Sequence, residues 1–387
     1  MATVLKLKEL GKIITGNTPR VSDLKNYSSN DINFVKPSDF LESEITYIDS
    51  SEFFISEYAR YKSRIVPSGS ILVTCIGNIG KVGITQKECA FNQQINAIIP
   101  DTSKVIPSFL AHILLYKKSE LNNLANNAVV PIINKKEFSE FKIHIPSIKK
   151  QKKIACKLDF LKNIISLRQK QLSKLDQLVK SRFIEMFGDE NYFQNWPTCK
   201  IGDIAKVYVG IVIKPSQYYT SDIKSGIKAF RSLNIGEMYI KNNDWVYFTK
   251  EGHQKNPKSI IKENDVLIVR SGSPGTACVA TKEYAGYNAI DIIIAHPNCK
   301  KINPIFLAMF TNMPHGMNQI RKNTGGAAQQ HFNVGEYKNI TIILPPLPPQ
   351  EQFAAFVQQV DKSKLAVKQS LEKLETLKKS LMQDYFG

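Results

Sequence analysis

Amide, hydroxyl and basic side chains gather in the glycine- and asparagine-rich loops of this sequence, and such side chains are suited to contact with nucleic acids. Lysine and arginine bind phosphate oxygens, whereas asparagine, glutamine and arginine can form paired hydrogen bonds to base edges. In the first half of the chain the candidates are Asn17, Arg20, Lys36, Asn78 and Lys81. In the second half they are Lys214, Arg231, Arg270, Ser271 and Ser273, together with Gln329, Gln330 and His331 in the loop TGGAAQQHFN. For each residue, a hydrogen bond that only stabilises its own loop is an equally good explanation.

The net charge favours a polyanionic partner. Lys and Arg number 52 against 34 Asp and Glu, which gives a formal charge of +18. An excess of this size favours nucleic acid first and an anionic membrane surface second, with a merely soluble basic protein as the alternative. Residues 147–188 hold 11 basic and 3 acidic residues, and their lysines cluster at Lys149, Lys150, Lys152, Lys153 and Lys157. A solvated helix face explains this run as well as contact with phosphates or an acidic partner does.

Sequence motifs for catalysis, metal binding and membrane insertion are absent. Gly77–Lys81 (GNIGK) has the wrong spacing for a phosphate-binding loop, and no GxGxxG, HExxH or GxSxG pattern occurs. The Asn/Asp-Pro-Pro-aromatic motif that holds the target amine in amino-methyltransferases is also missing. Six cysteines and six histidines are scattered without metal-ligand spacing, and no apolar run approaches the ~18 residues of a membrane span. We therefore expect a non-catalytic cytoplasmic protein without cofactor or metal, whose cysteines are free thiols and mostly buried.

The elements that must position these side chains are written twice along the chain. Residues 180–188 (KSRFIEMFG) match residues 379–387 (KSLMQDYFG) at an offset of 199, and Asn134 and Glu137 match Asn333 and Glu336. Upstream the offset is 195, where residues 71–80 (ILVTCIGNIG) match residues 266–275 (VLIVRSGSPG). A loop insertion of four residues accounts for the difference. The repeated block order predicts two similar halves, each consisting of a globular head and a helix.

Each head, Met1–Pro146 and Asp189–Pro345, is expected to be a mixed α/β domain with substantial β structure. Short apolar runs bounded by turn residues predict strands, and a proline suited to a first turn predicts where two helices begin. The predicted strands are Ser70–Ile76, Ile95–Ile99, Asp265–Val269 and Asp291–Ala295, and the predicted helices are Pro107–Tyr116 and Pro304–Asn312.

A long helix is predicted after each head, at residues 147–188 and 346–387. Between Gln151 and Met186 there is no Gly or Pro, and Gly188 follows as a natural terminator. Large side chains recur at alternating spacings of three and four residues, which is the spacing of a coiled-coil seam. The apolar seam residues are Leu158, Leu161, Ile165, Leu172, Leu175 and Val179 in the first helix, and Val357, Val360, Val367, Leu371, Leu374 and Leu381 in the second. Helices of about 50 Å are too long for the core of either head. The overall prediction is an α+β fold in which two heads are joined by an antiparallel helix pair with a pseudo-twofold axis.

With these features the sequence resembles the specificity subunit of Type I restriction-modification systems over essentially its whole length. The resemblance is carried by the paired head openings, LGKI at 10–13 before GNTP at 16–19 and IGDI at 201–204 before Gly210, and by the strand-plus-glycine blocks Val73–Gly80 and Ile268–Gly275. The proline-rich junction LPPLPPQEQ at 344–352 carries it most strongly, whereas the first copy, IPSIKKQ at 145–151, has lost most prolines and the acidic residue.

The resemblance implies an adaptor that reads DNA for a host-defence complex. Each head would be a target recognition domain for one half of a split, asymmetric DNA site, while the helices would set the gap and dock two modification subunits. Those partners would bind S-adenosylmethionine and methylate adenine. Restriction subunits, if present, would use ATP and Mg to translocate and cleave DNA.

Two other interpretations remain open: a two-headed scaffold that binds only proteins, and a duplicated enzyme such as a nuclease or methyltransferase. The enzyme would need an acidic cluster or cofactor loop in both copies, but Asp39 and Glu42 have no acidic counterparts in residues 231–234. Both alternatives predict that the chain retains no specific DNA sequence in the presence of a modification subunit.

Overall fold

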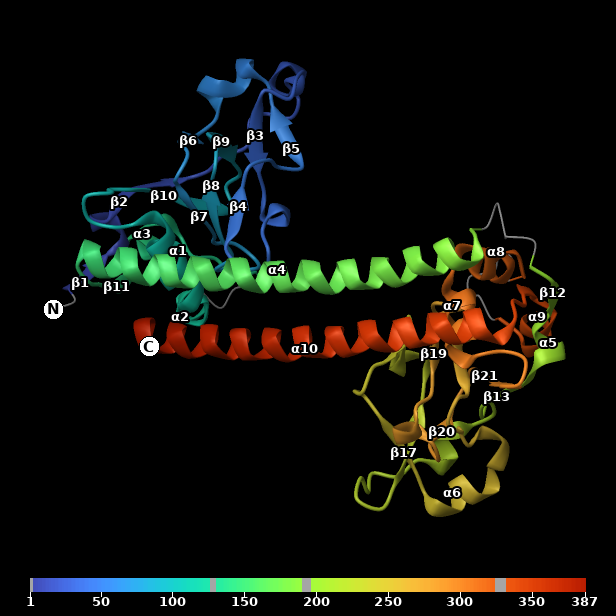
Figure 1. Ribbon diagram of the computed structural model, residues 1–387. Helices are drawn as coiled ribbons and strands as arrows, with labels where there is room; N and C mark the ends of the chain where they lie inside the picture. Colours follow the sequence, from blue (N-terminus) through green and yellow to red (C-terminus); the bar gives the residue numbers. More distant parts are fainter. Residues whose placement is uncertain (1–2, 126–129, 190–195, 324–331) are drawn as a thin grey trace. The chain divides into compact units, whose positions relative to one another are not determined.

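Two compact units make up the computed structural model, which describes residues 3–125, 130–189, 196–323 and 332–387 (Figure 1). Unit 1 comprises residues 1–169 and 369–387, and unit 2 comprises residues 170–368. Each unit therefore contains one head, the first part of the helix that follows this head, and the last part of the other long helix. This division is the one that antiparallel packing of the two helices predicts.

The head of unit 1 is built on two main sheets. The larger has the strand order β2-β10-β7-β8-β4 and the smaller has the order β5-β3-β9-β6, while β1 and β11 pair the two ends of the head. All four side chains of β7 are buried, as expected for a central strand with the sequence ILVT, in which the only polar side chain, Thr74, donates to the Asn78 carbonyl at 2.6 Å. The strands are β1 (Thr3–Lys6), β2 (Gly11–Thr15), β3 (Ile32–Val35), β4 (Thr46–Ile48), β5 (Phe53–Ile55), β6 (Ile65–Val66), β7 (Ile71–Thr74), β8 (Val82–Thr85), β9 (Cys89–Phe91), β10 (Ile95–Pro100) and β11 (Lys142–Ile145), and the helices are α1 (Pro107–Tyr116), α2 (Lys118–Asn123) and α3 (Lys135–Glu140).

The head of unit 2 repeats this topology. The sheet β13-β21-β18-β19 corresponds to β2-β10-β7-β8, and β17-β14-β20 corresponds to β5-β3-β9, with a parallel pair at β14–β20 as at β3–β9. The hairpin β15–β16 belongs to this head and was not predicted from the sequence. The strands are β12 (Thr198–Lys200), β13 (Ala205–Val209), β14 (Ile227–Phe230), β15 (Ile235–Gly236), β16 (Tyr239–Ile240), β17 (Val246–Phe248), β18 (Val266–Val269), β19 (Ala277–Val279), β20 (Asn288–Ala289), β21 (Ile292–Pro297) and β22 (Thr341–Ile343), and the helices are α5 (Ile201–Ile204), α6 (Lys250–Lys255), α7 (Pro304–Asn312), α8 (Pro314–Asn323) and α9 (Val334–Asn339).

The elements predicted from the sequence are found at the expected places. The four predicted strands are β7, β10, β18 and β21, and the two predicted helices are α1 and α7 with the predicted bounds. The repeated Asn and Glu form capping boxes at α3 and α9. In α3, the Asn134 side chain accepts a hydrogen bond from the Glu137 N–H, and the Glu137 carboxylate accepts one from the Asn134 N–H. The internal duplication is therefore confirmed at the level of topology and of individual hydrogen bonds.

The long helices are α4 (Ile148–Phe187) and α10 (Leu347–Phe386), of 40 residues each. Pro348 and Pro349 lie in the first turn of α10, where a missing N–H breaks no helical hydrogen bond. Along both helices the residues of the predicted seam are buried or half-buried. Buried are Leu158, Leu161 and Ile165 in unit 1 and Val179, Val357, Val360 and Val367 in unit 2, and half-buried are Leu172, Leu175, Leu371, Leu374 and Leu381.

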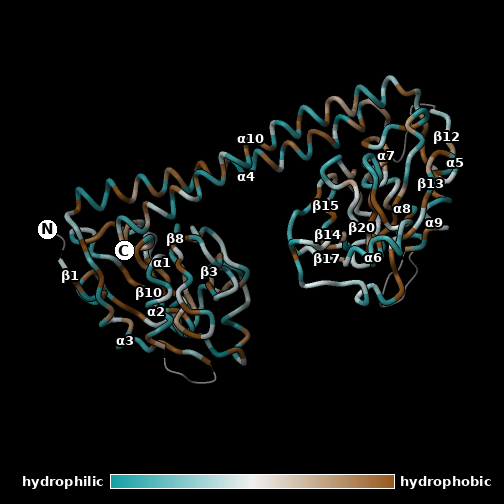
Figure 2. The backbone as a smooth tube through the Cα atoms, turned by 90° about the horizontal axis from the view of Figure 1, so that it is seen from below, coloured by the Kyte–Doolittle hydropathy of each residue, from teal (hydrophilic) through white to brown (hydrophobic). Residues whose placement is uncertain are grey.

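The end of each long helix completes the core of the other repeat's head. In unit 1, Phe386 of α10 meets Phe109 of α1 edge-on, with ring centroids 5.5 Å apart. In unit 2, Phe187 of α4 meets Phe306 of α7 in the same manner at 4.9 Å. Figure 2 shows hydrophobic residues inside both heads and alternating along α4 and α10. Each head therefore depends on residues from both halves of the sequence.

Candidate nucleic-acid interface

A glycine loop with the same backbone conformation follows the central strand of each head. Between β7 and β8, Gly77 and Gly80 have φ of 74° and 82°, and between β18 and β19, Gly272 and Gly275 have φ of 89° and 93°. The Gly80 N–H donates to the Thr74 carbonyl at 2.9 Å, and the Gly275 N–H donates to the Val269 carbonyl at 3.0 Å. Such φ values favour glycine, which has no Cβ to clash with the backbone. The two loops therefore share a backbone conformation but carry different side chains.

In head 1 the loop residues are held by Glu42. The Asn78 amide donates to the Glu42 carboxylate at 2.9 and 3.1 Å, and Lys81 Nζ lies 2.5 Å from Glu42 Oε1. These contacts lower the pKa of Glu42. Asn78 is exposed, whereas Lys81 is only 8% exposed. A DNA strand that contacts Asn78 and Lys81 must therefore compete with a carboxylate that is already in place, a feature that the sequence did not reveal because Glu42 lies 36 residues upstream of Asn78.

The other three candidates of head 1 differ in how free their side chains are to contact DNA. The Asn17 amide donates to the Lys62 carbonyl and accepts from the Arg64 N–H, so its side chain serves its own loop. Arg20 is exposed. Lys36 is half-buried, with Nζ 3.1 Å from the centroid of the Phe53 ring.

Head 1 also has an exposed cluster of aromatic and basic side chains that was not predicted from the sequence. Lys25 and Lys62 lie over the ring of Tyr58 at 5.9 and 3.7 Å, and Tyr61 is 96% exposed. Aromatic faces and lysines together suit single bases or the DNA backbone. Nothing in the sequence distinguished these tyrosines from the buried ones.

In head 2 the loop arginine is tied to the head by a salt bridge. Arg270 Nη1 lies 2.6 Å from Asp291 Oδ1, and Arg270 Nε donates to the Phe332 carbonyl. Ser271 Oγ donates to the same Asp291 at 3.4 Å. At the equivalent positions of head 1, the Asn96 amide contacts Cys75 Sγ at 3.2 Å. The two equivalent positions are therefore in contact in both heads, but the pair is neutral in head 1 and an ion pair in head 2.

The remaining candidates of head 2 include two exposed side chains. Ser273 and Lys214 are exposed, and Lys214 adopts a left-handed conformation with φ of 44°. The Arg231 guanidinium donates to the Asp244 carbonyl, so it is engaged within the head. Gln329, Gln330 and His331 lie outside the described residues.

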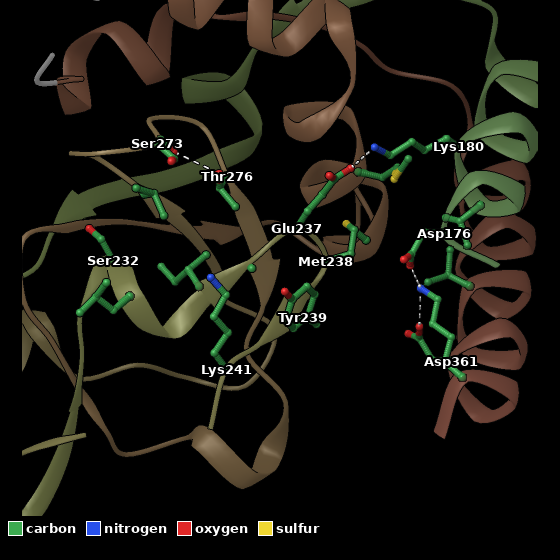
Figure 3. A pocket seen from close by; sticks show the side chains of 18 of the residues that line it. Asp176, Lys180, Ser232, Glu237, Met238, Tyr239, Lys241, Ser273, Thr276 and Asp361 are labelled. Carbon is green, nitrogen blue, oxygen red and sulfur yellow. Dashed lines mark hydrogen bonds and ion pairs between the residues drawn. The ribbon is translucent and has the colours of Figure 1, made fainter. Parts of the chain in front are cut away.

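A hollow of about 650 Å³ is lined by residues of head 2 and of the long helices of unit 2 (Figure 3). Its head wall includes Ser232, Ser273 and Thr276. On the opposite wall, Lys364 bridges Asp176 at 2.7 Å and Asp361 at 3.5 Å. Lys180 pairs with Glu237 at 2.7 Å across the edge of the hollow. Because carboxylates and lysines neutralise each other here, the hollow is unsuited to binding a phosphate by charge alone.

The lysine run at the start of α4 forms one solvated face. Lys149, Lys150, Lys152, Lys153 and Lys157 are all exposed, whereas Ile154, Ala155 and Leu158 on the opposite side of the helix are buried. Within the described part of the chain, none of the five forms an ion pair. Unpaired lysine ammonium groups are available for phosphates.

Further along α4, two apolar side chains are exposed. Phe160 and Leu167 are 63% and 64% exposed, and half-buried Ile164 lies between them. Spacings of four and three residues place the three on one side of the helix. They form an apolar strip that the head of unit 1 does not cover.

The described residues offer neither a cluster of metal ligands nor a membrane-spanning helix. No group of three His, Cys, Asp or Glu that could hold a metal ion occurs among them, and none of their helices is long and apolar enough to cross a membrane. Cys75, Cys89 and Cys278 are buried, which raises the pKa of each thiol to about 12, and Cys156 and Cys299 are exposed. Three of the six cysteines are therefore buried, which is fewer than the majority expected from the sequence.

Comparisons with known proteins agree with the duplicated fold. The profile of the family described as Type I restriction modification DNA specificity domain matches twice, at residues 2–177 and 194–377. The MjaIX specificity subunit of Methanocaldococcus jannaschii is 25% identical, over 92% of this chain and 85% of the relative. The EcoBI specificity subunit of Escherichia coli is 20% identical, over 84% of this chain and 76% of the relative.

Solved structures of similar fold match this chain over essentially its whole length. The Type I restriction-modification S subunit from M. genitalium superposes with a TM-score of 0.61 at 14% identity, and the match covers 100% of this chain and 96% of that one. At this identity the likeness concerns the fold alone.

Proposed function

Because the chain belongs to the family of Type I restriction-modification DNA specificity subunits, we propose that it directs DNA methylation to a split, asymmetric site. Each head reads one half of the site, and α4 with α10 sets the gap between the halves. The chain acts as a non-catalytic adaptor without a cofactor of its own. Two modification subunits supply S-adenosylmethionine and adenine methylation, and restriction subunits, where present, use ATP and Mg.

The observation that carries this proposal is the pair of matched glycine loops. Their glycines share positive φ values at equivalent positions, but Asn78 in head 1 is replaced by Ser273 in head 2. A common frame with different polar side chains at its tip suits two domains that read different bases. The exposed residues Arg20, Lys214 and the cluster around Tyr58 extend the proposed interface, and the loop containing Gln329, Gln330 and His331 remains a candidate from the sequence.

The apolar strip on α4 supports the proposal that partner subunits dock on the helices. Phe160, Ile164 and Leu167 present a side of the helix that a partner helix can cover, with anchors at the i, i+4 and i+7 positions. Covering this strip removes apolar surface from water, which favours association. A modification subunit bound here lies on the same rigid helix that carries the head.

Methylome sequencing tests the proposal. A host is provided with a compatible modification subunit, with and without this chain. We expect one bipartite motif, methylated on both strands, only when both proteins are present. Methylation by this chain alone would make it an enzyme, and no motif with a competent partner would favour the protein-binding scaffold.

A further inference from the structure

One buried glutamine fastens the start of each long helix to its head. Gln151 is the fourth residue of α4, and Gln350 is the fourth residue of α10. Both side chains are 0% exposed. The two lie at the offset of 199 that relates the repeats, so they are equivalent positions.

Each amide joins the same three segments. The Gln151 side chain accepts from the Ile106 N–H at 2.9 Å and donates to the carbonyls of Lys104 and Pro146 at 3.0 and 2.9 Å. Ile106 and Lys104 lie just before α1, Pro146 follows β11, and Gln151 itself lies at the start of α4. One side chain thus fixes the helix against two separate parts of head 1.

The second copy reproduces these contacts. The Gln350 side chain accepts from the Asn303 N–H at 2.8 Å and donates to the carbonyls of Lys301 and Pro345 at 3.3 and 2.6 Å. The neighbouring residues are not kept between the repeats, since Lys149, Lys150 and Lys152 correspond to Pro348, Pro349 and Glu351. The glutamine and its three backbone contacts persist although the residues around them differ.

Only glutamine provides this combination of groups at this length. A glutamate accepts but does not donate, and a leucine or methionine does neither. Loss of the amide leaves one N–H and two carbonyl groups of the head without their partner, which favours a shift of the helix against the head.

We propose that Gln151 and Gln350 are positioning residues that fix the angle between each head and its helix, and thereby the gap between half-sites that the protein accepts. This inference rests on the proposed function. A helix of 40 residues is about 60 Å long. A change of about 5° at one end moves the other by about 5 Å, which corresponds to one to two base pairs of DNA.

The test uses the full chain assembled with its modification subunits and a set of duplexes in which the gap differs by single base pairs. Methylation rates are measured for the wild type, for Gln151→Met and for Gln350→Met, which keep the side-chain length but remove the hydrogen bonds. We expect the preference for the cognate gap over gaps one base pair longer or shorter to fall about tenfold. Discrimination against single base changes inside either half-site stays at the wild-type value, because the reading loops are untouched. Gln352→Met, at an exposed position two residues after Gln350, is the matched control and leaves both quantities unchanged.

The outcomes separate positioning from simple stabilisation. An unchanged gap profile in both Met variants overturns the inference, and so does a loss of base discrimination in step with gap preference. If a Met variant melts more than a few degrees below the wild type, Gln151→Asn and Gln350→Asn replace it, since a neutral amide that is one methylene shorter buries no charge but cannot reach all three backbone groups at once. A wild type without any gap-dependent methylation contradicts the proposed function instead.

Discussion

Replacing Phe386 by alanine tests whether the last turn of the chain belongs to the first head. Phe386 is 6% exposed and packs against Phe109 and Tyr116 of α1, with ring centroids 5.5 and 5.9 Å away. Truncation of a buried phenylalanine costs about 3–5 kcal/mol. Since a domain is stable by only about 5–15 kcal/mol, Phe386→Ala is expected to remove a large share of the stability of head 1.

Amide hydrogen exchange followed by mass spectrometry measures this effect for each head separately. Opening that costs 3 kcal/mol less speeds exchange about 100-fold, so amides of α1 should exchange at least that much faster in Phe386→Ala while those of α7 stay unchanged. Phe187→Ala should do the reverse, because Phe187 packs on Phe306 of α7. Asp384→Ala, at an exposed position of the same helix turn, is the control. Equal effects on α1 and α7, or no effect on either, would refute the exchange of helix ends between the repeats.

Three further experiments test the lysine run on α4, the contacts of Glu42 and the packing of the glycine loop in head 2. Replacing Lys149, Lys150, Lys152, Lys153 and Lys157 by glutamine should weaken binding to all DNA sequences alike and reduce the salt dependence, log K against log salt, by about 0.9 per lost phosphate contact; an unchanged slope would leave these lysines as a merely solvated face. Glu42→Gln should tighten DNA binding by roughly fivefold at low salt, because it removes a carboxylate beside Asn78 and Lys81, and titration calorimetry showing equal or weaker affinity would contradict this. In urea unfolding, Gly275→Ala should destabilise head 2 more than Gly272→Ala does. Both glycines have positive φ, but only at Gly275 would a Cβ lie 2.7 Å from a buried side chain, that of Ile320. Strain alone costs about 1–2 kcal/mol and the clash adds about 1–3 kcal/mol, so equal losses would argue against this packing.

The repeated elements could be predicted from the sequence because their signals are local. The run ILVTCIGNIG contains an apolar strand and two glycines, and the structure places a buried strand and two positive φ values there. Asn134 and Glu137 recur in the second half as Asn333 and Glu336, and in the structure each of these pairs, three residues apart, forms a capping box. The repetition of each pattern in the second half then indicated a second head.

Whether the candidate side chains are free to contact DNA could not be predicted, because their hydrogen bonds and ion pairs join segments that are distant in the sequence. Lys81 looked like a free cation, but Glu42 from another loop neutralises it. Arg270 is paired with Asp291, and Asn17 is occupied by the backbone of residues 62 and 64. Gln151 and Gln350 were visible as a repeated pair, but only the structure showed that each amide binds three backbone groups.

The most direct test of the central claim, that each head reads one half of the site, is to join two copies of residues 1–188 in one chain. Head 2 would then be replaced by a second head 1. The end of each long helix would still pack on a head, because Phe187 and Phe386 are equivalent residues of the repeat. Methylome sequencing with the modification subunit should reveal an inverted repeat of one half of the wild-type motif. The wild-type asymmetric motif, or a motif unrelated to either half, would contradict the account.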